Sequence, residues 1–219
     1  MDSVQLVERA IREHATFKAA ILALRKRPTD DQAVEVLLGA YREGRAPAWL
    51  TVALLGALRA ESAYELVHEM LRTQHGCGIE GYAASALKDI RAERAAPDLL
   101  EVAWTAADGR TRNAAAAMLT NTATILALAR AGRIHHTTVA YKITRDGVDE
   151  VVLLALLSSD AEIDLRIGTE CLQSWLRDAR LSSLRERVEP SLRRVLALTD
   201  FRMAPSKRRA LVAWLGERS

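Results

Sequence analysis

A pattern of paired helical segments recurs along the chain, and this recurrence constrains the fold more than any other feature. One unit runs from Ala96 to Leu119 and turns at Asp108-Gly109. About 33 residues earlier, a similar unit runs from Ala63 to Leu87 and turns at Gly76-Cys77-Gly78. Repetition at such a period is typical of chains built from stacked helix pairs rather than around one pocket.

Composition favours helices throughout the chain. Hydrophobic residues make up 49% of the 219 residues, but aromatic residues only 5%, and Ala and Leu dominate. Small and unbranched side chains lose little rotamer freedom in a helix. The sequence therefore predicts an all-α protein in which strands play no part.

Apolar residues recur at steps of three and four in most of the chain, as expected for amphipathic helices. The segment after Pro47 carries one broad apolar stripe, and Pro190 is expected to kink or restart its helix. After Asn121 the regularity weakens, so the register of residues 122–147 stays open. Residues 4–13 and 17–26 fit one helix or two short ones. The other predicted helices cover 31–43, 47–58, 63–71, 79–90, 97–107, 111–119, 125–131, 139–146, 148–157, 163–176, 184–196 and 205–215.

No linker rich in Gly, Ser or Pro divides the chain, which indicates one domain over residues 1–219. We predict N-terminal capping helices in residues 1–46, repeats in 47–178 and basic C-terminal capping helices in 179–219. The net charge is only +3, but it is unevenly distributed. Residues 176–219 hold 11 Lys or Arg and 5 Asp or Glu, whereas residues 1–175 hold 20 and 23.

Two of the units resemble HEAT repeats, in particular the short repeats of about 30 residues found in bilin-lyase-like HEAT proteins. In the first unit the resemblance rests on Pro97-Asp98-Leu99-Leu100, Asp108, Arg112, Ala114-Ala115-Ala116 and Met118-Leu119; in the second it rests on Asp149, Val151-Val152, Asp160, Arg166 and Cys171-Leu172. The second unit lacks the Pro and the Ala run. The resemblance implies a right-handed α-solenoid of antiparallel helix pairs, an α-α superhelix.

The same resemblance implies structural roles for four charged residues. In HEAT repeats, an Asp in the turn and an Arg at the start of the second helix commonly form a ladder between adjacent repeats. The matching positions here are Asp108, Arg112, Asp160 and Arg166. We interpret them as contacts between repeats rather than as ligand-binding residues.

The sequence shows no motif of a cofactor site or of a catalytic nucleophile. His68, His75 and Cys77 lie close together, but a closed zinc site needs a fourth ligand, so we predict neither a metal nor a cofactor. The adjacent His135-His136 is interpreted as part of a loop or helix cap. The chain is therefore predicted not to be an enzyme.

Targeting signals are also missing from the sequence. There are only two cysteines, nearly a hundred positions apart, and no run of about 18 apolar residues. The first residues lack the basic and then apolar pattern of a signal peptide. These features predict a cytoplasmic protein with no membrane partner.

The leading functional hypothesis is a non-enzymatic scaffold, adaptor or immunity-type inhibitor that binds another protein on a concave face. Trp104 lies beside an apolar stripe and is a candidate binding hot spot if it is exposed, although core packing is the alternative.

A second hypothesis is nucleic-acid binding through the basic end, where Lys207, Arg208 and Arg209 could add phosphate contacts. A bilin-lyase-like enzyme ranks third. The candidate partner-binding arginines are Arg177, Arg180, Arg185, Arg187, Arg193 and Arg194.

Overall fold

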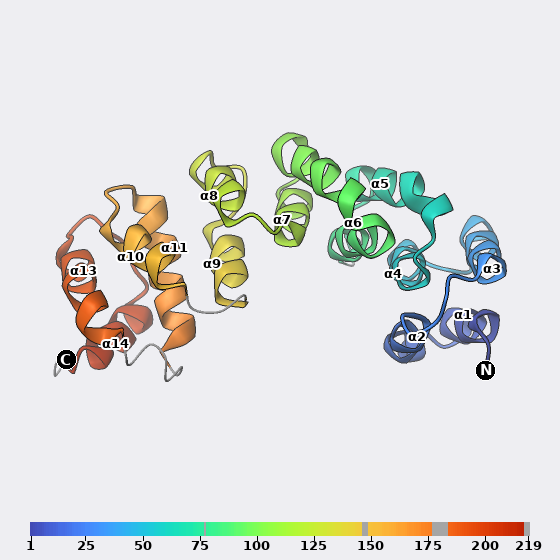
Figure 1. Ribbon diagram of the computed structural model, residues 1–219, viewed down its shortest axis with the longest axis horizontal. Helices are drawn as coiled ribbons and strands as arrows, with labels where there is room; N and C mark the ends of the chain where they lie inside the picture. Colours follow the sequence, from blue (N-terminus) through green and yellow to red (C-terminus); the bar gives the residue numbers. More distant parts are fainter. Residues whose placement is uncertain (77, 146–148, 177–183, 217–219) are drawn as a thin grey trace. The chain divides into compact units, whose positions relative to one another are not determined.

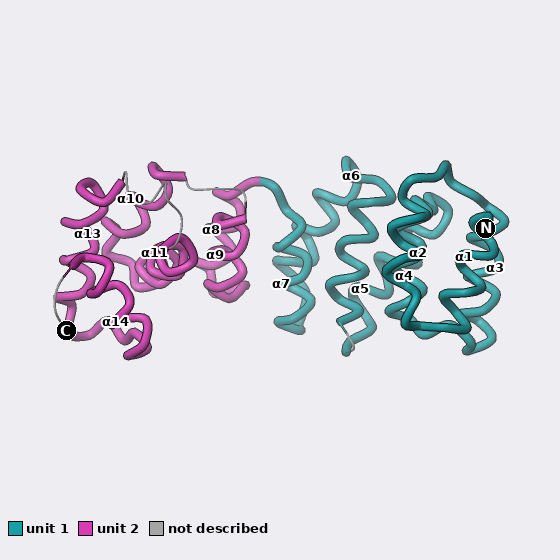
Figure 2. Tube along the Cα trace, turned by 90° about the horizontal axis from the view of Figure 1, so that it is seen from below, with its two compact units in different colours: residues 1–120 teal, residues 121–219 magenta. Residues whose placement is uncertain are grey.

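The computed structural model describes residues 1–76, 78–145, 149–176 and 184–216. Within these ranges the chain forms 13 α-helices, two short 3-10 helices and no strand, which confirms the all-α prediction. The chain divides into two compact units, Met1–Thr120 and Asn121–Ser219 (Figure 2). The boundary falls in the short connection between two helices, which explains why composition gave no sign of it.

Unit 1 is made of helices that pack in pairs (Figure 1). Contacts also join successive pairs, since α2 packs on α4 and α4 packs on α6. The helices of this unit are α1 (Ser3–Arg12), α2 (Phe17–Leu24), α3 (Asp31–Arg42), α4 (Ala48–Leu58), α5 (Tyr64–Thr73), α6 (Ile79–Thr105) and α7 (Gly109–Met118), with 3-10 helices at His14–Thr16 and Glu61–Ala63.

Helix α6 is two helices joined at a kink. Arg91 interrupts it with non-helical backbone angles, φ −156° and ψ 85°. Helix α6 as a whole packs on both α5 and α7, and the kink divides it into residues 79–90 and 92–105. The sequence predicted the second helix from Pro97, but it begins five residues earlier, and Pro97 lies inside it.

Helix α4 is buried on every side rather than along one stripe. All nine residues from Leu50 to Leu58 are buried, because α2, α3 and α6 pack around this helix. Thr51 is the one hydroxyl among them, and it donates a hydrogen bond to the carbonyl of Pro47 (3.1 Å). The prediction of a single apolar stripe was therefore too narrow.

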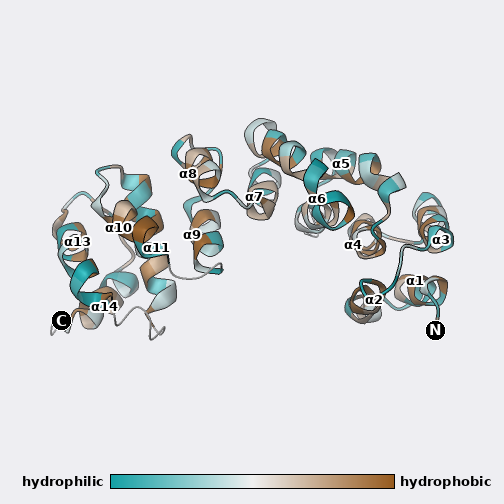
Figure 3. Cartoon of the chain, in the orientation of Figure 1, coloured by the Kyte–Doolittle hydropathy of each residue, from teal (hydrophilic) through white to brown (hydrophobic). Residues whose placement is uncertain are grey.

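Unit 2 contains α8 (Thr122–Arg130), α9 (His136–Arg145), α10 (Glu150–Ser158), α11 (Glu162–Trp175), α13 (Arg185–Ala197) and α14 (Pro205–Trp214). Residues 122–147, whose register the sequence left open, thus supply the pair α8 and α9. Helix α11 packs on α9, α10 and α14, and the apolar residues of α10 and α11 are drawn brown in Figure 3. Helix α13 continues through Pro190 and does not restart there.

The same capping chemistry begins several helices. The side chain of the residue before the helix accepts a hydrogen bond from the backbone N–H three positions later, which satisfies an otherwise unpaired donor. The residues that cap in this way are Asp2, Asp30, Asp108, Asn121 and Asp149. Four of them, all except Asp108, begin the first helix of a pair, so the sequence marks these boundaries locally.

None of the described helices combines the length and the apolar character that a bilayer crossing requires.

Candidate functional site

An apolar groove with a volume of about 370 Å³ lies between α2, α4 and α6 in unit 1. Such a volume lies within the range of small-molecule pockets and also admits one or two large side chains of a partner. The lining residues are Phe17, Lys18, Ile21, Leu22, Arg25, Ala53, Tyr82, Ser85, Ala86 and Asp89.

Small residues on α4 create the groove. Ala53 lies between the larger side chains of α2 and α6, so the middle helix does not fill the space between its neighbours. One turn further on, Gly56 lets α4 approach α6 very closely, since a Cβ atom at Gly56 would lie 2.7 Å from the Cα atom of Ala86. Small side chains at a helix contact permit such short interaxial distances.

Different interactions hold the two ends of the groove. At one end the rings of Phe17, Trp49 and Tyr82 meet, with centroids 5.1 to 6.2 Å apart. At the other end, the guanidinium of Arg25 on α2 forms an ion pair with Asp89 on α6. Eight residues of α2 separate the two ends, which corresponds to about 12 Å along the helix axis.

The rim of the groove carries an exposed apolar side chain and a cation. Leu22 is 63% exposed, which is unusual for a leucine beside an apolar depression. Lys18 is exposed and lines the same side, and none of the ion pairs in the described residues includes it. The groove thus offers an aliphatic surface with one positive charge, suited to an apolar segment that also carries a carboxylate.

The structure places the predicted hot spot Trp104 on α6 with 39% of its surface exposed. Its partial exposure keeps it available for binding, but it does not line the groove. Leu22 and the groove were not singled out from sequence, because the residues that form the groove lie up to 72 positions apart, from Phe17 to Asp89.

Four of the candidate partner-binding arginines lie in described residues, and they make contacts within unit 2. Arg185 donates to the carbonyl of Leu215 (2.7 Å), and its guanidinium lies 5.8 Å from the ring centroid of Trp214. The remaining three form the ion pairs Arg187–Glu150, Arg193–Glu189 and Arg194–Asp160. Arg177 and Arg180 lie outside the described residues. Since these four arginines have intramolecular partners, their contacts add no support to nucleic-acid binding, which stays a prediction.

The four ladder positions have different contacts. Asp108 caps α7, and Arg112 donates to the carbonyls of Ala106 and Ala107 in the same turn (2.8 and 2.6 Å). Arg166 pairs with Glu162 one turn away on α11. Asp160 pairs with Arg194, which is 34 residues away on α13. The contact of Asp160 with Arg194 thus joins successive helix pairs.

Sequence reasoning missed a stronger contact of this kind. Arg130, the last residue of α8, donates two hydrogen bonds to the carboxylate of Asp164 in α11 (2.9 and 3.0 Å). Ser159 donates a third (2.8 Å), and the Asp164 side chain is only 6% exposed. The sequence pattern of a ladder position is present here too. Asp164 follows a turn, and it lies 34 residues after Arg130, which ends a helix.

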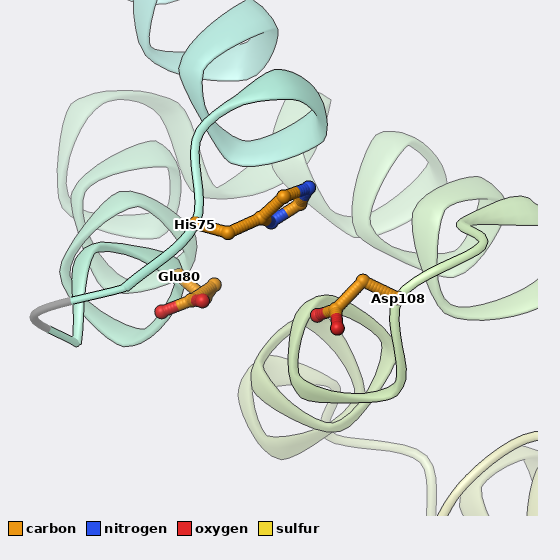
Figure 4. Close-up of side chains that lie close together, drawn as sticks. All are labelled: His75, Glu80 and Asp108. Atoms are coloured by element: carbon orange, nitrogen blue, oxygen red, sulfur yellow. The ribbon is translucent and has the colours of Figure 1, made fainter.

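A second cluster lies in unit 1, where the loop after α5 meets the start of α7. His75, Glu80 and Asp108 each direct a possible ligand atom into one space, and these atoms all lie within 4.8 Å of one another (Figure 4). Asp108 accepts hydrogen bonds from the backbone N–H and the hydroxyl of Thr111 (2.8 and 3.1 Å). The bond from the Thr111 N–H is the main cause that holds the pKa of Asp108 below its usual value, and His75 acts in the same direction.

Of the other sulfur and histidine candidates, Cys77 lies outside the described residues. Cys171 is buried in α11, and burial raises the pKa of its thiol to about 12. A thiol with such a pKa stays protonated near neutral pH and is a poor nucleophile or metal ligand. The rings of His135 and His136 lie 4.1 Å apart at the start of α9, where burial lowers the pKa of His136.

Comparisons with known proteins give no relative. A scan against protein-family models found no match, and searches of curated proteins and of solved structures found no significant match.

Proposed function

We propose that this protein is a non-enzymatic, HEAT-like α-solenoid that binds a partner protein in the groove between α2, α4 and α6. The groove with the exposed Leu22 is the observation that carries the binding proposal. Large exposed apolar side chains beside a depression are typical of protein interaction sites. The proposed occupant is a short segment of the partner with neighbouring aliphatic side chains and a carboxylate positioned for Lys18.

The proposed repeat architecture is supported by the spacing of the helix pairs. The first helices of the pairs begin at residues 3, 31, 64, 92, 122, 150 and 185, so successive starts lie 28 to 35 residues apart. Polar contacts recur at the same separation within both units. Examples at 33 or 34 residues are Gln74–Tyr41, Tyr64–Asp98, Arg59–Arg25, Arg130–Asp164, Ser158–Ser191 and Arg194–Asp160.

Small-angle X-ray scattering tests the solenoid proposal. A compact domain of this length has a radius of gyration of about 17 Å. A continuous stack of seven helix pairs, spaced by about 8–10 Å, is expected to give a value above about 21 Å. A monomeric sample with the compact value would contradict the solenoid, whereas the binding proposal, which needs only unit 1, would stand.

Substitution of Leu22 by aspartate tests the binding proposal. We expect Leu22→Asp to weaken partner binding at least tenfold, or by more than about 1.4 kcal/mol, because a charge replaces the apolar contact. The free energy of unfolding should change by less than about 0.5 kcal/mol, since the Leu22 side chain is mostly exposed. The measurement is affinity enrichment from the native cell with both proteins, followed by titration of the purified partner.

A matched control is available in unit 2. Val151 is 78% exposed, and Val151→Asp introduces the same charge away from the groove. The partner should bind this variant as it binds the unchanged protein. If every enriched protein binds Leu22→Asp and Val151→Asp equally well, the groove is not the binding site.

A further inference from the structure

The cluster of His75, Glu80 and Asp108 combines side chains from three separate segments. His75 lies in the loop after α5, Glu80 in the first turn of α6, and Asp108 directly before α7. Figure 4 shows the two carboxylates on the same side of the imidazole ring. Their possible ligand atoms lie within 4.8 Å of one another, so one small ion is in reach of all three.

Glu80 supplies a second and independent observation. The residue is only 4% exposed, and its Oε1 atom accepts one hydrogen bond, from the backbone N–H of Gly76 (3.0 Å). No lysine or arginine among the described residues forms an ion pair with it. A buried carboxylate is costly unless a counter-charge or several donors compensate it. The cluster that Glu80 belongs to contains one imidazole, His75, and a second carboxylate, Asp108.

We propose that His75, Glu80 and Asp108 bind a divalent transition-metal ion of the zinc type. One imidazole and two carboxylates are ligands that this class of ion accepts, and a dication neutralises both carboxylates. With bonds of about 2.0–2.2 Å, tetrahedral ligands lie about 3.4 Å apart. The exposed His75 side chain can close the remaining distance by rotating toward the carboxylates. Water completes the coordination as the fourth ligand.

Thr111 is positioned as a supporting residue for two of these ligands. Its hydroxyl donates to Asp108, and the same oxygen lies 3.4 Å from Nδ1 of His75. Hydrogen bonds to metal ligands orient them and raise affinity for the ion. This arrangement joins the α5–α6 loop to the start of α7, so bound metal would tie two successive helix pairs together.

The test is a titration of chelator-treated, tag-free, full-length protein with Co²⁺, followed by competition with Zn²⁺. We expect one equivalent of Co²⁺ to produce visible absorption bands of a bound ion, and Zn²⁺ to abolish them by displacement. The melting temperature should rise with metal concentration. His75→Ala should weaken binding at least tenfold and remove the thermal shift. This variant changes an exposed side chain, so its fold should be retained.

The control is His14→Ala, which removes another exposed histidine of unit 1 and should leave Co²⁺ binding unchanged. The proposal is overturned if no stoichiometric binding occurs, or if the two histidine variants bind the metal alike. The former result would mean that the N-terminus of α6 and the hydrogen bond from Gly76 stabilise the Glu80 carboxylate without a metal ion. An intense near-ultraviolet thiolate band would add a cysteine ligand and overturn the proposed ligand set.

Discussion

Replacing Gly56 with alanine is expected to lower the free energy of unfolding by about 2 kcal/mol, because the added methyl group collides with α6. The new Cβ atom would lie 2.7 Å from Cα and 2.8 Å from Cβ of Ala86. The nearest atom belongs to the backbone, so side-chain rotation cannot relieve the contact and the helices must separate. This cost exceeds the gain of up to about 1 kcal/mol that alanine brings over glycine in a helix.

Gly39 provides the matched control for this substitution. It lies in α3, and nothing within 4 Å would meet a Cβ atom there. Gly39→Ala is therefore expected to raise the free energy of unfolding by about 0.5–1 kcal/mol. The measurement is urea denaturation followed by circular dichroism, with amide hydrogen exchange to locate the effect.

Amide hydrogen exchange should become faster in α4 and α6 of the Gly56→Ala protein and stay unchanged in α10 and α11 of unit 2. Substitution by alanine is thus expected to lower the free energy of unfolding at Gly56 and to raise it at Gly39. Equal effects of both substitutions would show that α4 and α6 do not approach each other as closely as described.

Replacing Asp164 with alanine is expected to destabilise the protein by about 2–3 kcal/mol. The change removes the acceptor of two charge-assisted hydrogen bonds from Arg130 and of a third bond from Ser159. The Arg130 side chain is 54% exposed, so water can replace its lost partner and the cost stays below that of a fully buried pair. Chemical denaturation measures the change in the free energy of unfolding.

A double-mutant cycle with Arg130→Ala separates the ion pair from the other contacts of Asp164, and we expect a coupling energy of about 1–2 kcal/mol. Glu162 on the same helix provides the control, because its pair with Arg166 is exposed and one turn apart. Glu162→Ala should cost less than about 0.5 kcal/mol. A coupling energy near zero between Arg130 and Asp164 would show that this contact does not stabilise the junction of α8 and α11.

The helices were largely predictable, because their signals are local. Capping residues such as Asp30 and Asp149 directly precede the helices they begin, and apolar residues at steps of three and four define the buried sides. The sequence correctly separated the two halves of α6, but the second half begins before Pro97, which lies inside it. Helix α13 includes Pro190 and does not restart there, whereas a kink at this residue stays a prediction.

The candidate sites were much less predictable. His75 was noted from sequence beside His68 and Cys77, whereas the residues that meet it are Glu80 and Asp108. Asp108 was interpreted as a ladder position, and in the structure it caps α7 and also faces His75. One residue can fill both roles, because a carboxylate has two oxygens and several lone pairs.

The sequence by itself determined that this chain forms paired helices at a period near 30 residues, because helix formation, capping and amphipathic spacing depend on neighbouring residues. Only the tertiary structure decided which surfaces those pairs present. The groove requires α2 and α6 to flank the small residues of α4, and the His75 cluster requires two loops 33 residues apart to meet. Both depend on how closely neighbouring helices and loops approach each other, which packing sets and periodicity does not encode.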